Sequence, residues 1–409
     1  MDTTQATGIG PVPDSSASPG FLANFFLRKL RNIENGRLIV TLPNGYSETL
    51  GKGKGEAILF RVKDSSFFPR VLASGAVGFG EAYVEGIWET NDLDRLLNLL
   101  AHESAKFSRL EKGYSWVRRV GNMLYHSSRK NSLSNSKRNI QEHYDLSNDF
   151  YQTFLDPTMC YSAALFDEMN GDLETAQYRK LDRVLDLADI KQGDRVLEIG
   201  SGWGALAMRA AEKRGAQVDT ITLSEEQLAL AEELIHERGL EDRIDIRLQD
   251  YRALKGQYDA IVSVEMIEAV GREYLEGYFE VIQRSLKPGG KAVIQCITMP
   301  DHRYESYCKT CDWIQKHIFP GGHLPSPGLL KGIVSQMPNL EWVQMDSFGI
   351  HYAETLQRWQ RAFTDKLDEV HALGFDDNFI RKWRYYLSYC EAGFRNELIS
   401  VEHIVIQRV

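Results

Sequence analysis

The segment VLEIGSGWG, residues 196–204, constrains the fold of this chain more than any other stretch. An apolar run ends in an acid, Glu198, and three alternating glycines follow, Gly200, Gly202 and Gly204. Glycine adopts backbone angles closed to other residues and lets a ligand approach the main chain closely. We therefore expect a strand that ends here, a tight turn, and a helix over 205–214 whose N-terminal amide groups point at a nucleotide-like cofactor.

This glycine turn alone is compatible with more than one cofactor. It also fits the dinucleotide pattern G-x-G-x-x-A, with Ala205 in the last position, and a glycine turn without a ligand is a further alternative. Dinucleotide binding needs an acid about 20 residues on, at the tip of the next strand, whereas AQVDTITLS ends near Thr222 and Ser224. Glu198 favours S-adenosylmethionine (SAM), because the ammonium group at the amino-acid end of SAM attracts an acid.

The composition is that of a globular protein and excludes several classes. At 409 residues, with 43% hydrophobic and 26% charged residues, the chain is long enough for two domains. The net charge of −9 argues against a nucleic-acid binder, and five cysteines are too few for a secreted disulfide framework. No apolar run approaches the ~20 residues of a membrane span. We expect a cytoplasmic protein whose membrane contact is peripheral.

The N-terminal part of the chain is expected to form a smaller, separate domain. Residues 1–20 are rich in Ser, Pro, Gly and Thr and predict a disordered tail, since they lack the features of a signal peptide. Residues 21–33 predict an amphipathic basic helix, and 37–90 mix short strands with a helix near 69–74.

The stretch 100–140 carries nine Lys or Arg against two acids, with aromatic residues among the charges, and its Ser/Asn-rich part predicts a linker over 126–139. A solvated helix face with a hinge is one interpretation. Contact with an anionic membrane surface is the other. We favour the membrane because an acidic protein with one basic aromatic patch is asymmetric.

From residue 141 onward strands and helices alternate, which is typical of a parallel sheet covered by helices on both faces. We expect helices at about 225–238, 272–285 and 326–336. The aromatic block 300–325 predicts a cap over the carboxyl edge of the sheet, where such folds bind ligands. The strands are expected at 195–200, 216–222, 243–249, 258–264, 290–298, 340–348 and 401–408.

Polar segments follow these strands and converge on that edge: TLSEEQ (222–227), LQDY (248–251), VEMIEAVG (264–271) and IQCIT (294–298). Two upstream segments, HYDLSNDFY (143–151) and MCYSAALF (159–166), lie just before the sheet and can fold over the cofactor. The candidate cofactor ligands are Tyr144, Tyr161, Ser162, Glu198, Gly200, Gly202, Gly204, Thr222, Gln227, Gln249 and Asp250.

Together with FPGGHLPS, these motifs resemble the cyclopropane-fatty-acid synthase family, which includes the mycolic acid methyltransferases. The match is dense over 140–409 and looser over 37–95. It implies an α/β class I SAM-dependent methyltransferase with a Rossmann-like, mostly parallel seven-stranded sheet over 140–409. The resemblance further implies an N-terminal α+β lipid- or membrane-binding domain over 21–125.

The resemblance also implies a reaction. The family transfers the methyl group of SAM to a cis double bond in an acyl chain of membrane phospholipid, through a carbocation, and forms a cyclopropane. We accordingly expect an unsaturated phospholipid in an anionic membrane surface as the partner, no nucleic acid, and a homodimer. The family uses a bound bicarbonate to take the proton.

The positions that match the bicarbonate site are Glu268, Tyr352, Gln295, Ile297 and Ala163. Gln295 stands where the family has a His, and Ala163 where it has a Cys; Glu265 is an added acid and Ala269 replaces another His. A glutamine cannot carry positive charge, which weakens the expected bicarbonate site. We hypothesise that Glu268, with Tyr352 and Gln295, positions the base, and that the product shifts toward methyl- or methylene-branched chains.

Two other function classes stay open: a SAM methyltransferase for a soluble acceptor, and an inactive SAM- or lipid-binding protein. Cys308 and Cys311 have the spacing of a metal site, and three histidines lie nearby in the sequence. A structural zinc site needs four ligands, usually with a second pair. We expect no metal.

Overall fold

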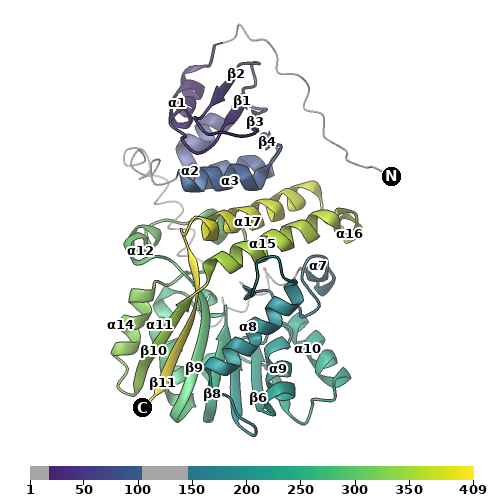
Figure 1. Ribbon diagram of the computed structural model, residues 1–409, viewed down its shortest axis with the longest axis vertical. Coiled ribbons are helices and arrows are strands. Elements are labelled where there is room, and N and C mark those ends of the chain that lie inside the picture. The colour runs from purple at the N-terminus through teal and green to yellow at the C-terminus, as the bar shows by residue number, and fades with distance from the viewer. Residues whose placement is uncertain (1–17, 104–145) are drawn as a thin grey trace. The chain divides into compact units, whose positions relative to one another are not determined.

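The computed structural model describes residues 18–103 and 146–409, shown in colour in Figure 1. The chain divides into two compact units, Met1–Arg118 and Arg119–Val409. The predicted tail over 1–17, the greater part of the basic stretch, the linker over 126–139 and Tyr144 lie outside the described residues. The predicted domain border lies there too.

The smaller unit is a four-stranded sheet with helices. Its strands are β1 (Leu38–Thr41), β2 (Ser47–Leu50), β3 (Ile58–Val62) and β4 (Trp88–Thr90), in the order β2-β1-β3-β4. An aromatic cluster holds it together, with Phe60 and Phe79 packed against Trp88 at 5.2 and 4.5 Å between ring centroids. The helices are α1 (Phe21–Leu30), α2 (Phe67–Val84) and α3 (Leu93–His102). The helix predicted near 69–74 is confirmed as the first part of α2, which breaks at Gly75, where φ is 56° and ψ is −134°.

The larger unit contains the predicted seven-stranded sheet, and every predicted strand is confirmed. The order β10-β11-β9-β8-β5-β6-β7 is parallel except for β11, which runs antiparallel to both of its neighbours. The strands are β5 (Arg195–Ile199), β6 (Gln217–Thr222), β7 (Ile244–Leu248), β8 (Tyr258–Val264), β9 (Leu286–Thr298), β10 (Leu340–Ser347) and β11 (Ser400–Arg408).

Helices cover both faces of this sheet (Figure 1). On one face, Phe279 and Ile282 of α11 (Leu275–Ser285) and Leu330 of α14 (Pro327–Ser335) belong to a buried core with the strands. The core of the other face includes side chains of α8 (Leu173–Leu187), α9 (Ala205–Arg214) and α10 (Glu225–Glu237). This three-layer arrangement leaves the carboxyl ends of the parallel strands free to build a site.

Further helices lie at that end of the sheet in Figure 1. They are α7 (Asn148–Gln152), α15 (Gly349–Asp365), α16 (Leu367–Ala372) and α17 (Asp377–Arg395). The block predicted as a cap contains α12 (Asp301–Tyr307) and α13 (Trp313–His317). It is tied to the end of β9, because Met299 N donates to Pro325 O at 2.9 Å.

Candidate active site

The glycine turn has the backbone that the sequence predicts. After β5 ends at Ile199, Gly200, Gly202 and Gly204 have φ angles of 97°, 51° and 86°, in the left-handed region that favours glycine. A Cβ atom on Gly202 would meet no atom within 4 Å, whereas one on Gly200 would lie 3.1 Å from the Met266 side chain. The turn therefore leaves open space beside Gly202 for a ligand.

A cavity of about 170 Å³ borders this turn. Of the predicted cofactor ligands, Gly204 and Asp250 do not line it; Gly204 instead caps α9, and the Asp250 carboxylate binds Arg252 at 2.6 Å. The predicted ligands that do line the cavity are Tyr161, Ser162, Glu198, Gly200, Gly202, Thr222, Gln227 and Gln249. The segments named from the sequence thus meet at one edge of the sheet, as expected for a nucleotide-like cofactor.

Glu198 is the acid that the sequence places opposite the cofactor's ammonium group. It is buried, Thr220 donates to its Oε2 at 2.5 Å, and burial raises its pKa to about 8. Below this pH most of the carboxyl group is protonated, and the protonated form binds a cation more weakly than the carboxylate does. Its role toward the cofactor stays a prediction.

We expect the affinity for SAM to rise severalfold between pH 6 and 8.5, as Glu198 loses its proton. Calorimetric titration of SAM across this range measures the effect. The same titration of Glu198→Gln is the control, because it retains only the titration of SAM itself. Parallel pH profiles for the two proteins would contradict the assignment.

Lys180 is a buried cation in this cavity that sequence reasoning missed. It is 1% exposed, and in the described part of the chain its ammonium group makes one hydrogen bond, to Ser162 Oγ at 2.6 Å. Gln177, three residues earlier on α8, donates to Ser162 O at 2.9 Å. The i, i+3 spacing of Gln177 and Lys180 is the only sequence signal, and it is also common on solvated helices.

Glu265, directly after β8, is the centre of a second group of polar contacts on the wall of the cavity. Its Oε1 accepts hydrogen bonds from Ala163 N at 2.9 Å and Gln295 Nε2 at 2.8 Å. Its Oε2 accepts one from the Tyr352 hydroxyl at 2.7 Å. Three predicted catalytic residues therefore converge on an acid that was expected beside the reacting centre but was not among the predicted catalytic residues.

The backbone of Glu265 is strained, which is typical of functional positions. Its φ angle is 49°, in the left-handed region that glutamate rarely adopts, and its N–H donates to Gln295 O at 2.7 Å. Burial raises the pKa of Glu265. A carboxylate with a raised pKa is a stronger base than an ordinary glutamate.

Gln295 is itself oriented by a neighbour on β11. Its Oε1 lies 2.9 Å from His403 Nε2, and the two residues are paired across the β9–β11 ladder. Burial lowers the pKa of His403 to about 3, so this imidazole is neutral and donates its Nε2–H. With its oxygen held in this way, Gln295 must direct its amide N–H₂ at Glu265.

Among the described residues, Glu268 is hydrogen-bonded to neither Tyr352 nor Gln295, so its predicted role with them stays a prediction. Glu268 Oε1 accepts a hydrogen bond from Ile297 N at 2.5 Å, and its Oε2 has no hydrogen-bond partner among the described residues. Burial and then the nearby Glu265 carboxylate raise the pKa of Glu268 to about 8. Glu265 and Glu268 both follow β8, but only Glu265 is hydrogen-bonded to Tyr352 of α15.

Bicarbonate does not fit the site as it is built. Ala163 N, Gln295 and Tyr352, which the family resemblance assigns to the anion, are already hydrogen-bonded to the Glu265 carboxylate. A second anion beside Glu265 would meet a like charge in a poorly solvated place. The three departures from the family pattern, Glu265, Gln295 and Ala163, are therefore joined by hydrogen bonds in one place.

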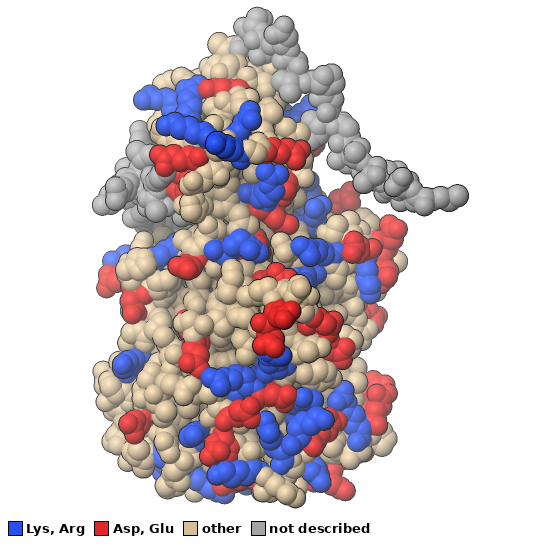
Figure 2. Space-filling view, in the orientation of Figure 1, with Lys and Arg blue, Asp and Glu red and all other residues tan. Residues whose placement is uncertain are grey.

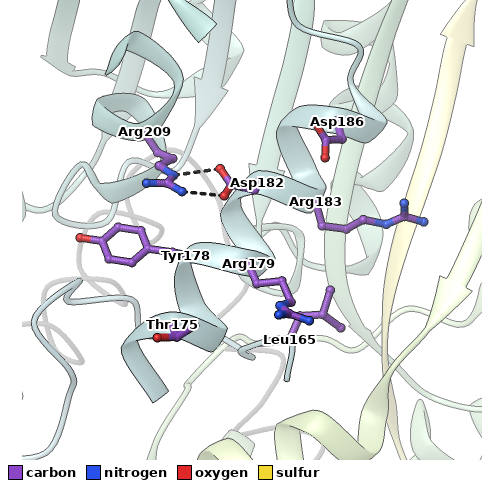
Figure 3. Close-up of a pocket in the computed structure, with 8 residues that line it drawn as sticks. All are labelled: Leu165, Thr175, Tyr178, Arg179, Asp182, Arg183, Asp186 and Arg209. Carbon is purple, nitrogen blue, oxygen red and sulfur yellow. Dashed lines mark hydrogen bonds and ion pairs between the residues drawn. The ribbon is translucent and has the colours of Figure 1, made fainter. Parts of the chain in front are cut away.

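A second cavity, of about 500 Å³, lies on α8 and α9 and includes none of the predicted site residues (Figure 3). Arg209 makes two hydrogen bonds to Asp182, at 2.8 and 2.6 Å, drawn as dashed lines in Figure 3. Arg179 and Arg183 also have carboxylate partners, Asp167 and Asp346. Because its arginines are already neutralised, this cavity offers no anion site.

The described residues, 18–103 and 146–409, contain neither a metal-binding cluster nor a membrane-spanning helix. No three His, Cys, Asp or Glu side chains there could hold a metal ion together, and this includes the Cys308–Cys311 pair. No helix in these ranges is long and apolar enough to cross a membrane.

Comparison with known proteins shows the family to which the chain belongs. Residues 131–404 match the mycolic acid cyclopropane synthetase family. The chain belongs to this family. A tuberculostearic acid methyltransferase of Mycobacterium tuberculosis is 40% identical over 402 residues, which cover 96% of this chain and 91% of the relative. A cyclopropane-fatty-acyl-phospholipid synthase of Escherichia coli is 36% identical and covers 85% of this chain and 87% of its own.

Solved structures of the mycolic acid cyclopropane synthetase family share the fold of the larger unit. One such synthase, complexed with SAH and CTAB, matches 66% of this chain and 98% of its own at 31% identity, with a TM-score of 0.63. A coclaurine N-methyltransferase with SAH also shares the fold, at 21% identity and a TM-score of 0.63. The predicted class I methyltransferase fold, the SAM cofactor and the methyltransferase activity are thereby confirmed.

Proposed function

We propose that the protein methylates a cis double bond in an acyl chain of membrane phospholipid, and that Glu265 is the base that completes the reaction. The observation that carries the proposal is the Glu265 carboxylate, which lines the cofactor cavity and accepts hydrogen bonds from Ala163, Gln295 and Tyr352. These donors hold it in one place. The names of the two relatives, a tuberculostearic acid methyltransferase and a cyclopropane-fatty-acyl-phospholipid synthase, support the substrate class.

The residues around the cavity suit SAM. Thr222 donates to Gln227 Oε1 at 2.9 Å at the end of β6, and Lys180 donates to Ser162 Oγ at 2.6 Å. Among the described residues that line the cavity, Lys180 is the one cation and Glu198 and Glu265 are the acids. The cation complements the carboxylate of SAM, and the two acids, once ionised, complement its ammonium and sulfonium groups. When bound, SAM supplies an electrophilic methyl group.

Glu265 then handles the charge that methylation leaves on the chain. The double-bond electrons form the new carbon–carbon bond, and the adjacent chain carbon becomes a carbocation. A hydride shift from the methylated carbon moves the positive charge onto that carbon. Glu265 removes a proton from the new methyl group, and the released electron pair forms a C=CH₂ branch. The nearby carboxylate also stabilises the cation before the proton leaves.

We favour this branched product over a cyclopropane. The groups expected to bind bicarbonate instead bind the carboxylate of Glu265. Because this base is attached to the chain, it cannot move within the site as a small anion could. The relative with the greater coverage of this chain is named a methyltransferase and not a cyclopropane synthase. The methylene branch, its methyl-branched alkene isomer and the cyclopropane have the same mass, so mass spectrometry alone does not separate them.

The test is incubation with SAM and vesicles of a cis-unsaturated phospholipid. We expect SAH to form only with the vesicles, and proton NMR of the recovered acyl chains to show the vinylidene protons of a methylene branch. Vesicles of saturated lipid are the control. Exclusively upfield cyclopropane protons would contradict the product, and SAH formation on a soluble acceptor without vesicles would contradict the substrate class.

A further inference from the structure

One face of α1 exposes large apolar side chains that the described residues of the smaller unit do not bury. Phe21 is 86% exposed, Phe25 44% and Leu22 39%. Leu27 and Leu30 of the same helix are buried. One face of the helix therefore packs on the unit and the other exposes apolar side chains. Contact of such an apolar surface with water is unfavourable.

Basic residues continue this exposed face toward the end of the helix. Phe21, Phe25 and Arg28 recur at spacings of four and three, and so share one side of α1. Lys29 lies seven residues after Leu22, and its ammonium group is 5.3 Å from the ring centre of Phe25. Within the described residues, neither Arg28 nor Lys29 forms an ion pair, and α1 contains no acid.

A neighbouring loop adds two more cations. Lys52 and Lys54, between β2 and β3, are exposed and form no ion pair with any residue that the structure describes. The loop lies beside the chain that follows α1, because Lys52 N donates to Ile33 O and Gly53 N to Gly36 O, each at 3.2 Å. By contrast, Arg31 is neutralised by Glu48 at 2.8 Å.

The larger unit shows a different charge pattern. On the face drawn in Figure 2, acidic and basic side chains are interspersed over this unit. Within the described residues, α1 carries three exposed apolar side chains and two cations without acidic partners, and the β2–β3 loop carries two more such cations.

We propose that α1 is an interfacial anchor for an anionic phospholipid bilayer. Phe21, Leu22 and Phe25 insert among the acyl chains, while the four cations (Arg28, Lys29, Lys52 and Lys54) contact lipid phosphates. Apolar area and basic charge on one helix face are what such binding requires. A second copy of the chain fits less well, because a symmetric contact would bring the same cations face to face. This inference rests on the proposed function, which makes phospholipid the substrate.

Vesicle binding tests the anchor without any methyl transfer. The full chain is sedimented with vesicles of dimyristoyl-phosphatidylglycerol or dimyristoyl-phosphatidylcholine, which have no double bond. We expect binding to the anionic vesicles, and a loss of at least about tenfold in Phe21→Ser/Phe25→Ser. Arg28→Gln/Lys29→Gln is expected to weaken binding by about tenfold or more and to reduce its dependence on salt.

A matched control removes two exposed apolar side chains elsewhere. Val343 and Leu373 are 45% and 38% exposed in the larger unit, and Val343→Ser/Leu373→Ser should bind as the unaltered protein does. The anchor is wrong if Phe21→Ser/Phe25→Ser binds normally, if the unaltered protein binds neither vesicle, or if this double variant instead turns a dimer into a monomer. Since saturated lipids cannot be methylated, these outcomes are independent of the catalytic proposal.

Discussion

Replacing Glu265 with glutamine is expected to lower kcat by about 10²–10⁴-fold, the range for loss of a general base, with a much smaller change in the Kd for SAM. Glutamine keeps the shape of the side chain, but it cannot take a proton. Ala163, Gln295 and Tyr352 would still meet a polar group of the same size. SAH release with unsaturated phospholipid vesicles measures kcat, and calorimetry measures SAM binding.

Glu268→Gln is the matched control, because it makes the same change three residues along. The raised pKa of about 8 keeps much of the Glu268 carboxyl protonated at neutral pH, and a glutamine oxygen can still accept from Ile297 N. We expect a loss of less than about tenfold, well below the general-base range. Equal losses of kcat in the two variants would contradict the assignment of the base to Glu265 and favour Glu268.

Replacing Lys180 with methionine is expected to weaken SAM binding by about 10- to 100-fold, the range for loss of a hydrogen bond to a charged group. Lys180 is buried, and its ammonium group has a single hydrogen bond within the described part of the chain, so it can hold the carboxylate of the cofactor. Methionine fills a similar volume without the charge. Calorimetric titration with SAM gives the Kd, and circular dichroism verifies folding.

The control for Lys180 is Lys287→Met. Lys287 pairs with Asp259 at 2.7 Å and does not line the cavity. This variant should bind SAM as tightly as the unaltered protein. Ser162→Ala, which removes the hydroxyl partner of Lys180, should weaken binding by a smaller factor. If Lys180→Met folds and binds SAM normally, Lys180 has no part in holding the cofactor.

The sheet and its cofactor edge were predictable because their signals are local. Each strand is an apolar run, and the strand–turn–helix at Gly200–Gly204 needs glycine at positive φ. Polar residues after parallel strands meet at one edge whatever the details of packing. The helices α8 and α15, which bring Lys180 and Tyr352 to the site, carry no comparable signal and were not predicted.

The choice between Glu265 and Glu268 could not be made from the sequence. Both acids follow β8, and the family resemblance pointed to Glu268. The difference comes from the left-handed backbone of Glu265, whose N–H binds Gln295 O and whose carboxylate meets Tyr352 of α15. These contacts join positions 30 and 87 residues apart. No local pattern announces such a conformation in a glutamate.

Dependence on dissolved bicarbonate tests most directly whether Glu265 is the base. The rate of SAH formation is measured in buffer freed of carbon dioxide and again with added bicarbonate, for the unaltered protein and for Glu265→Ala. We predict that the unaltered protein works equally well in both. Glu265→Ala should be inactive without bicarbonate and partly restored by it, because the removed carboxylate frees Ala163 N, Gln295 and Tyr352. An unaltered protein that loses its activity without bicarbonate would contradict the role of Glu265.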